Sequence, residues 1–186
     1  SFPTRRSSDL FEQSAMVAQE ISASGRQQDI QRLIERIGDT QHRLTVLYGQ
    51  SGVGKSSVVE AGLIPTLRQK PIGARDVAPV LLRVYTHWEQ ELEKALTAAL
   101  GALPIDAKLA TDCTSLAAIL EQLRCNEQHH LLTVLILDQF EEFFFIYKTP
   151  AERKRFFEFL RNCLNIPSVK VILSIREDYL HYLLEG

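Results

Sequence analysis

Cysteine is scarce in this chain of 186 residues, which contains three: Cys113, Cys125 and Cys163. They are odd in number and widely spaced, so they match neither a disulfide framework nor the ligand spacing of a zinc site. A chain of this length buries enough apolar surface to fold without such crosslinks. We therefore expect reduced thiols in a single globular domain of a cytoplasmic protein.

Long apolar runs and an excess of charge are also missing. The apolar stretch 131–137 is far shorter than the ~20 residues that a membrane-spanning helix needs. Lysine and arginine number 21 against 23 aspartate and glutamate residues, a formal net charge of −2. A protein without a basic excess is not expected to hold nucleic acid or an anionic membrane through its net charge.

The first ten residues, SFPTRRSSDL, resemble the conceptual translation of a sequencing adapter, and we set 1–10 apart from the fold as an artefact. The Arg5-Arg6 pair does not indicate an export signal, because no apolar stretch of signal-peptide length follows it. We divide the rest of the chain into an N-terminal flank and helix, 11–42, and a core, 43–186.

Hydrophobic periodicity predicts strands that alternate with helices along the rest of the chain. Strands are expected at 44–48, 77–85, 131–137 and 169–175. Helices are expected at 27–37, 56–67, 88–100, 115–125, 150–164 and 177–184, with a loop at 101–112. This alternation predicts an α/β three-layer fold with a mostly parallel sheet.

Two local signals refine these boundaries. Pro79 cannot donate a hydrogen bond to a strand ladder, so we expect it among the first residues of its strand. Thr149, Pro150 and Glu152 have the spacing of a capping box with proline at the first helical position, which predicts a helix start there.

The segment Gly49-Gln50-Ser51-Gly52-Val53-Gly54-Lys55-Ser56 fits the pattern G-x-x-x-x-G-K-[ST] and lies between a predicted strand and a predicted helix. The glycines allow backbone N–H groups to surround a phosphate at the positive end of the helix dipole. Lys55 is expected to pair with phosphate oxygens, and the Ser56 hydroxyl is expected to bind Mg²⁺. The nucleotide-binding candidates extend to Ser57.

Besides Ser56, a phosphate-binding loop of this kind needs an acidic residue that binds the metal, at the end of a neighbouring buried strand. Asp138 follows the apolar run 131–137, and we interpret it as that Mg²⁺-binding acid, the Walker B aspartate. Either Glu141 or Glu142 is expected to orient and deprotonate an attacking water. A nearby glutamate favours the class of P-loop ATPases with an extra strand between the two motif-bearing strands. Whether 77–85 is that strand or a peripheral one stays open.

Two arginines are further candidates. Arg176 follows the strand 169–175 at the carboxyl edge where open α/β sheets bind ligands, so it is expected to sense a γ-phosphate. A surface ion pair with Glu177 or Asp178 is the alternative for this side chain. Arg26, next to Gly25, is expected to contact the base or ribose of a nucleotide, with a helix cap as the alternative.

The Gly25-Arg26 turn, the loop GQSGVGKSS, the block LILDQFEEFF and the strand end ILSIRED together resemble the STAND NTPases. The similarity is greatest to the novel STAND group of bacterial signalling and conflict-system proteins, and it covers about 23–184. It implies an ASCE/AAA-like P-loop NTPase fold that uses ATP and Mg²⁺. It further implies a switch that rests with ADP, oligomerises with ATP and works beside effector and repeat-built sensor domains.

Two departures from the family pattern limit what the resemblance implies. Gln27 stands where the family usually has glutamate. The fifth strand, the helical lid and the winged-helix part are expected to be missing, so we expect a C-terminally truncated core. Without an arginine finger, hydrolysis by such a core is expected to be slow.

The sequence therefore predicts an ATP-binding, slowly hydrolysing signalling switch domain of a larger protein. A constitutive AAA-like remodelling ATPase and a non-hydrolysing nucleotide-binding scaffold module are the alternatives. A GTPase is disfavoured because the base-reading pattern Asn-Lys-x-Asp is absent from the sequence. An ABC-type ATPase is disfavoured because its serine-glycine-rich signature is absent. No direct binding of nucleic acid is expected.

Overall fold

The structure, a computed structural model, describes residues 16–21, 25–50, 52–103 and 115–185. The segment 1–10, Ser51, Cys113 and most of the predicted loop 101–112 lie outside these ranges. Cys125 and Cys163 are free thiols.

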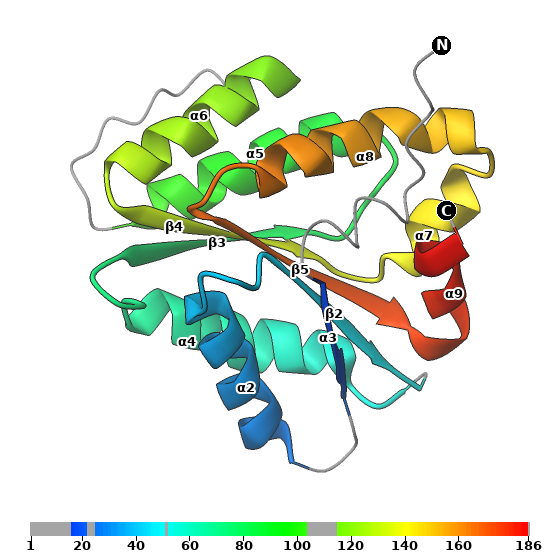
Figure 1. Cartoon of the computed structure of the whole chain (residues 1–186), viewed down its shortest axis with the longest axis horizontal. Coiled ribbons are helices and arrows are strands. Elements are labelled where there is room, and N and C mark those ends of the chain that lie inside the picture. Colours follow the sequence, from blue (N-terminus) through cyan, green and yellow to red (C-terminus); the bar gives the residue numbers. More distant parts are fainter. Residues whose placement is uncertain (1–15, 22–24, 51, 104–114, 186) are drawn as a thin grey trace.

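A five-stranded sheet forms the centre of the molecule (Figure 1), and every paired strand runs parallel to its neighbour. The strand order is β1-β2-β5-β4-β3. The strands are β1 (Val17–Glu20), β2 (Leu44–Gly49), β3 (Asp76–Leu82), β4 (Leu131–Leu137) and β5 (Val169–Arg176). The predicted α/β fold with a parallel sheet is confirmed.

This order answers the question that the sequence left open. The strand inserted between β2 and β4 is β5, which comes later in the chain than either of them. Among the described strands β3 pairs only with β4 and lies at the edge, so it is the peripheral strand.

Strand β1 was not predicted. It is four residues long and pairs with β2 from Val17 opposite Thr45 to Glu20 opposite Tyr48. Its sequence VAQE contains two polar residues, and so it lacks the apolar run or the long alternation by which strands are recognised.

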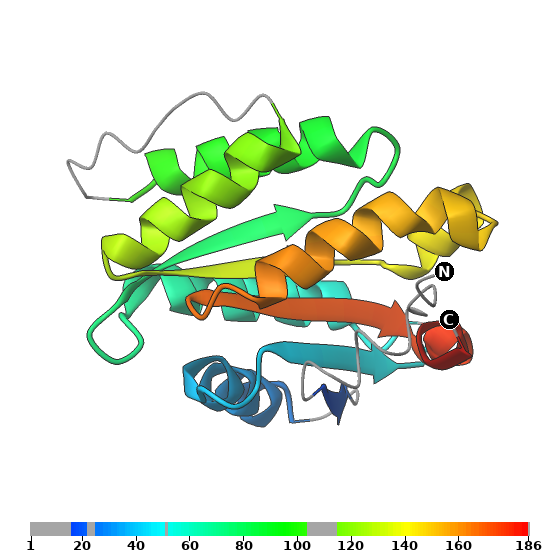
Figure 2. The same ribbon diagram turned by 45° about the horizontal axis from the view of Figure 1, so that its top comes forward.

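Helices cover both faces of the sheet (Figures 1 and 2). One apolar cluster joins the sheet to α2 and to the segment that follows the glycine-rich loop, through residues such as Leu33, Val59 and Leu63. The other cluster joins the opposite face to α5, α6 and α8, through residues such as Leu92, Leu123 and Phe159. The molecule therefore has the three layers that the alternation of elements predicts.

The helices and turns have the following bounds: α2 (Arg26–Gly38), α3 (Lys55–Ser57), η1 (Val58–Leu63), α4 (Ile64–Gln69), α5 (Trp88–Gly101), α6 (Leu116–Gln128), α7 (Glu141–Ile146), α8 (Pro150–Leu164), η2 (Glu177–Tyr179) and α9 (Leu180–Glu185). The helix predicted at 56–67 is continuous in space, but its middle part, η1, is π-helical. An additional residue in a helical turn changes the direction in which side chains point.

The two local signals have different outcomes. The capping box is present, with the Thr149 side chain and the Glu152 side chain each bonded to the other's backbone N–H. Pro79 is not among the first residues of its strand but is the fourth residue of β3. An edge strand tolerates proline at such a position because one of its sides has no partner strand.

Candidate functional site

The carboxyl ends of β2, β4 and β5 meet at one edge of the sheet. Gly49, the last residue of β2, lies opposite Arg176, the last residue of β5. The backbone N–H of Asp138 donates to the carbonyl oxygen of Leu82 at the end of β3 (2.9 Å). A cavity of about 390 Å³ opens there, and the residues that line it are Gly52, Gly54, Lys55, Ser56, Asp138, Gln139, Glu141, Glu142, Ser174 and Arg176.

The glycine-rich loop requires glycine for two separate reasons. Gly52 and Gly54 have φ angles of 83° and 90°, in the left-handed region that disfavours residues with a Cβ. At Gly49 a Cβ atom would lie 2.7 Å from the carbonyl oxygen of Ile21, which follows β1. The backbone conformation of the loop therefore requires glycine at two positions. Ile21, the residue after β1, packs closely against the first glycine of the loop.

Lys55 points back into this loop. Its Nζ donates to the carbonyl oxygens of Gly49 (3.1 Å) and Gln50 (3.3 Å). Partial burial lowers the pKa of Lys55, and the nearby Glu141 carboxylate opposes that shift. A charged group that is held in the loop by two neutral carbonyl oxygens is well placed to exchange them for the oxygens of an anionic ligand.

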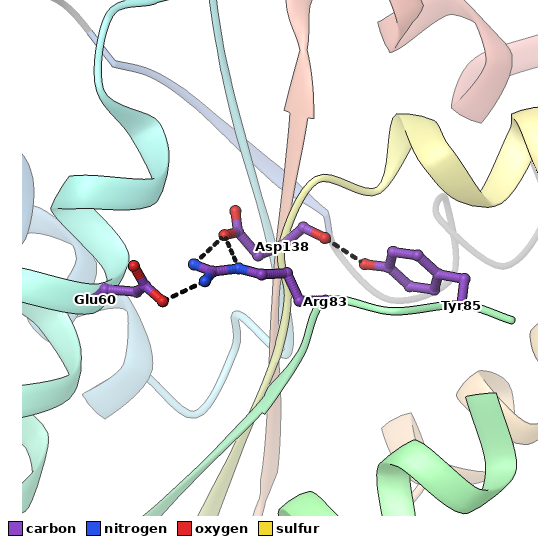
Figure 3. A network of polar contacts seen from close by, with 4 residues as sticks. All are labelled: Glu60, Arg83, Tyr85 and Asp138. Atoms are coloured by element: carbon purple, nitrogen blue, oxygen red, sulfur yellow. Dashed lines mark hydrogen bonds and ion pairs between the residues drawn. The ribbon is translucent and has the colours of Figure 1, made fainter. Parts of the chain in front are cut away.

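Asp138 is completely buried. The two oxygens of its carboxylate have different surroundings (Figure 3). Oδ2 accepts hydrogen bonds from Nε (3.0 Å) and Nη2 (2.8 Å) of Arg83, and the Tyr85 hydroxyl donates to the main-chain oxygen of Asp138 (2.6 Å). Oδ1 has no hydrogen-bond partner within the described parts of the chain. Since buried polar atoms are rarely unsatisfied, this oxygen is a candidate to bind a ligand.

The two candidate glutamates differ in environment, although both line the cavity. Glu141, the first residue of α7, is buried, and its Oε2 accepts a hydrogen bond from the backbone N–H of Arg176 (3.3 Å). Glu142 is exposed to solvent.

Arg176 forms the ion pair that was the alternative for it, and it also lines the cavity. Its Nη2 donates to Oδ2 of Asp178 (2.9 Å), and its guanidinium lies 5.2 Å from the centre of the Tyr179 ring. Its Nε is buried without a partner in the described structure. The ion pair therefore leaves part of the guanidinium available.

Arg26 lies against the loop and does not cap α2. The N-cap of α2 is Gly25, which makes no side-chain cap. Nη1 of Arg26 donates to the Ser57 hydroxyl (3.0 Å), and a Cβ at Gly54 would collide with the guanidinium. Val53 closes the turn by donating from its N–H to the carbonyl oxygen of Gln50 (3.3 Å).

The oxygen donors that line the cavity suit Mg²⁺ better than they suit a metal ion whose ligands all come from the protein. Within the described ranges, no three His, Cys, Asp or Glu residues form a metal-binding group. Mg²⁺ keeps several water ligands and takes only one or two protein groups together with phosphate oxygens. Ser56 and Asp138 line the same cavity, and the unpartnered Oδ1 is the kind of oxygen donor that this ion takes.

Three residues at this site were missed in the sequence: Glu60, Arg83 and Tyr85. Arg83 and Tyr85 follow β3, whose carboxyl end lies beside that of β4. Both lie inside the strand that the sequence predicts at 77–85, whereas β3 ends at Leu82. An earlier strand end would have put them at the edge where open α/β sheets bind ligands. Glu60 gave no such signal, because it lies within η1 and not at a strand end.

Comparison with known proteins gives a family match and similar solved structures. Residues 22–185 match the family described as Novel STAND NTPase 1. A Walker-type ATPase of Pyrococcus abyssi has a similar structure (TM-score 0.60, 20% identity), over 87% of this chain and 48% of that one. The Cdc6p structure of Pyrobaculum aerophilum matches less well (TM-score 0.48, 16% identity, 88% of this chain and 41% of that one).

The first of these structures has the same fold as this chain, which spans about half of its length. No curated protein matches the sequence. In the part of the chain that is described, none of the helices is both long enough and apolar enough to span a membrane.

Proposed function

We propose that this chain, which belongs to the novel STAND NTPase 1 family, binds ATP with Mg²⁺ and hydrolyses it slowly, as the switch of a larger signalling protein. The observation that carries the proposal is the cavity at the sheet edge, where Lys55, Asp138 and Glu141 meet. These residues supply a phosphate-binding cation, a metal ligand and a base for water.

Each group has a role that follows from its surroundings. The loop from Gly49 to Ser57 would hold the phosphates with its backbone N–H groups and with Lys55. Ser56 and Asp138 would hold Mg²⁺, which neutralises phosphate charge when bound. Arg26, beside Ser57, is proposed to contact the ribose or base.

We assign the positioning of the water to Glu141, since its carboxylate is held by the Arg176 N–H whereas Glu142 is exposed. The water oxygen attacks the γ-phosphorus while its proton passes to the Glu141 carboxylate. The bond from the γ-phosphorus to the bridging oxygen breaks, and ADP leaves with that electron pair. Lys55 and Arg176 stabilise the negative charge on the transferred group.

The switch role rests on the family and goes beyond the site itself. We propose an ADP-bound resting state, ATP-dependent association of copies, and effector and repeat-built sensor domains elsewhere in the full protein. We propose 43–186 as the NTPase core, to which β1 and α2 of the preceding flank add an edge strand and a covering helix. The turnover of an isolated core is expected to be low, because a γ-phosphate contact from a second chain can raise it by roughly 10³–10⁵.

Hydrolysis by matched glutamine variants tests the catalytic part. Glu141→Gln should lower single-turnover hydrolysis of ATP by roughly 10²–10⁴, the usual contribution of a general base, and should leave ATP affinity unchanged. Glu142→Gln is the control and should stay close to the unmodified chain. Equal hydrolysis by all three would contradict the assignment, and ATP binding without any hydrolysis would favour a scaffold module.

A further inference from the structure

We propose that Arg83 is a positioning residue for Asp138, and that Glu60 holds Arg83 in place. The pair would orient one carboxylate oxygen of Asp138 toward Mg²⁺ and would join the helix after the glycine-rich loop to the end of β4. This inference rests on the proposed function, because it concerns the same metal site.

The first step is the geometry of the guanidinium (Figure 3). Arg83 follows β3, and two of its nitrogens bind one oxygen of Asp138, at 3.0 and 2.8 Å. Its remaining terminal nitrogen, Nη1, forms an ion pair with Glu60. A planar guanidinium that is bound on both sides has little freedom to rotate, so its direction is set from the helix as well as from the strand.

The second step is the state of the Asp138 carboxylate. Its backbone is fixed at both polar atoms, by the Leu82 carbonyl oxygen and by the Tyr85 hydroxyl. Oδ2 is fixed by Arg83, whereas Oδ1 has no partner among the residues that the structure describes and points away from the guanidinium (Figure 3). Outer-shell partners orient metal ligands in this way, by binding the atoms that the metal does not use.

The third step is charge. A guanidinium beside a metal site repels a divalent cation, but the Glu60 carboxylate balances the charge of Arg83. The side chains of Arg83 and Glu60 are 33% and 47% exposed, and an ion pair with that exposure adds little to stability. The ion pair between Arg83 and Glu60 is therefore expected to matter more for the metal site than for the stability of the chain.

The test is the Mg²⁺ concentration that half-maximally raises the melting temperature in the presence of ATP. Loss of an outer-shell partner typically weakens metal affinity 10–100-fold. Arg83→Ala is expected to raise the required Mg²⁺ concentration by about that factor, and its ATP affinity without Mg²⁺ is expected to change much less. Glu60→Gln should shift the requirement in the same direction by a smaller factor, and Arg83→Lys should recover part of the loss.

Arg155→Ala is the matched control. Arg155 also pairs with a distant glutamate, Glu89, but does not line the cavity, and so its Mg²⁺ requirement should be that of the unmodified chain. An unchanged or lower requirement in Arg83→Ala would overturn the proposal. If that variant does not fold, an unchanged requirement in both Glu60→Gln and Arg83→Lys would overturn it. An unmodified chain that binds no nucleotide would overturn the proposed function as well.

Discussion

Lys55 has a charge in surroundings that disfavour it until an anion arrives. Burial lowers its pKa, and among the described residues its Nζ donates to the carbonyl oxygens of Gly49 and Gln50 alone. The charged Lys55 ammonium therefore lowers the free energy of unfolding of the nucleotide-free chain. Phosphate oxygens that replace the carbonyl oxygens as its partners should restore that free energy. Residues at functional sites commonly have perturbed pKa values of this kind.

This state of Lys55 predicts a pH dependence. A folded-state pKa below the ordinary value of 10.5 means that the unfolded chain binds more protons between those two values. The destabilisation is therefore complete below the lowered pKa and disappears as the pH rises toward 10.5. Lys55→Met, measured by urea unfolding without nucleotide, should be at least as stable as the unmodified chain at pH 7.

The difference in unfolding free energy between the two chains should then shrink as the pH is raised through that window. Lys148→Met, at a solvent-accessible position outside the cavity, is the control and should show no such trend. A Lys55→Met chain that is less stable at pH 7, with a deficit that grows with pH, would contradict this account of the empty site.

At the residue scale, the sequence singled out the motif residues but not the residues that contact them. Lys55 and Asp138 lie in short patterns whose spacing reflects their chemistry, so they could be identified from sequence. Arg83 and Glu60 act through contacts to residues far away in the chain, and a single sequence has no record of such pairs. Our proposed choice of Glu141 over Glu142 likewise rests on a contact that the sequence does not reveal, with the backbone N–H of Arg176.

Helix α8 is stabilised at its N-terminus by a capping box. The box formed by Thr149 and Glu152 satisfies backbone N–H groups at the start of the helix. The backbone N–H groups of Thr149 and Lys148 bond to the Glu152 carboxylate and lower its pKa. The same helix then buries Phe156, Phe159 and Leu160 against the sheet, so that capping and packing support each other.

Thr149→Ala should therefore lower the free energy of unfolding by about 1 kcal/mol, the usual effect of losing an N-cap side chain. Denaturant titration measures this difference, and Thr149→Ser, which keeps the hydroxyl, should recover most of it. ATP binding should be unaffected, because α8 contributes no residue to the cavity. A variant with unchanged stability would mean that the packing of α8 alone determines where it begins.

Elements were predictable where one physical signal dominated. The long apolar run of β4 and the capping box of α8 are such cases. Strand β1 was not, because its position depends on pairing with β2 and on the contact of Ile21 with Gly49. The π-helical turn of η1 was not predicted either, since hydrophobic periodicity indicated one continuous helix at 56–67.

At the scale of the whole molecule, strand order creates the site. Because β5 lies between β2 and β4, the loop after β2 and the acid after β4 are on either side of it, and Arg176 at its end faces the space between them. Alternating strands and helices were enough to predict a parallel sheet. The order of the strands needed the structure, because four strands with similar apolar patterns can be arranged in several ways.

The most direct test of the central claim is equilibrium binding of ATP, ADP and GTP to the chain, with and without Mg²⁺, beside Lys55→Met. The account predicts adenine-selective binding to the unmodified chain. Loss of a charge-assisted contact of about 1.5–3 kcal/mol should make binding to the variant roughly tenfold to a hundredfold weaker. Equal binding by both chains, or no binding by a folded unmodified chain, would contradict the claim that this cavity is a nucleotide site.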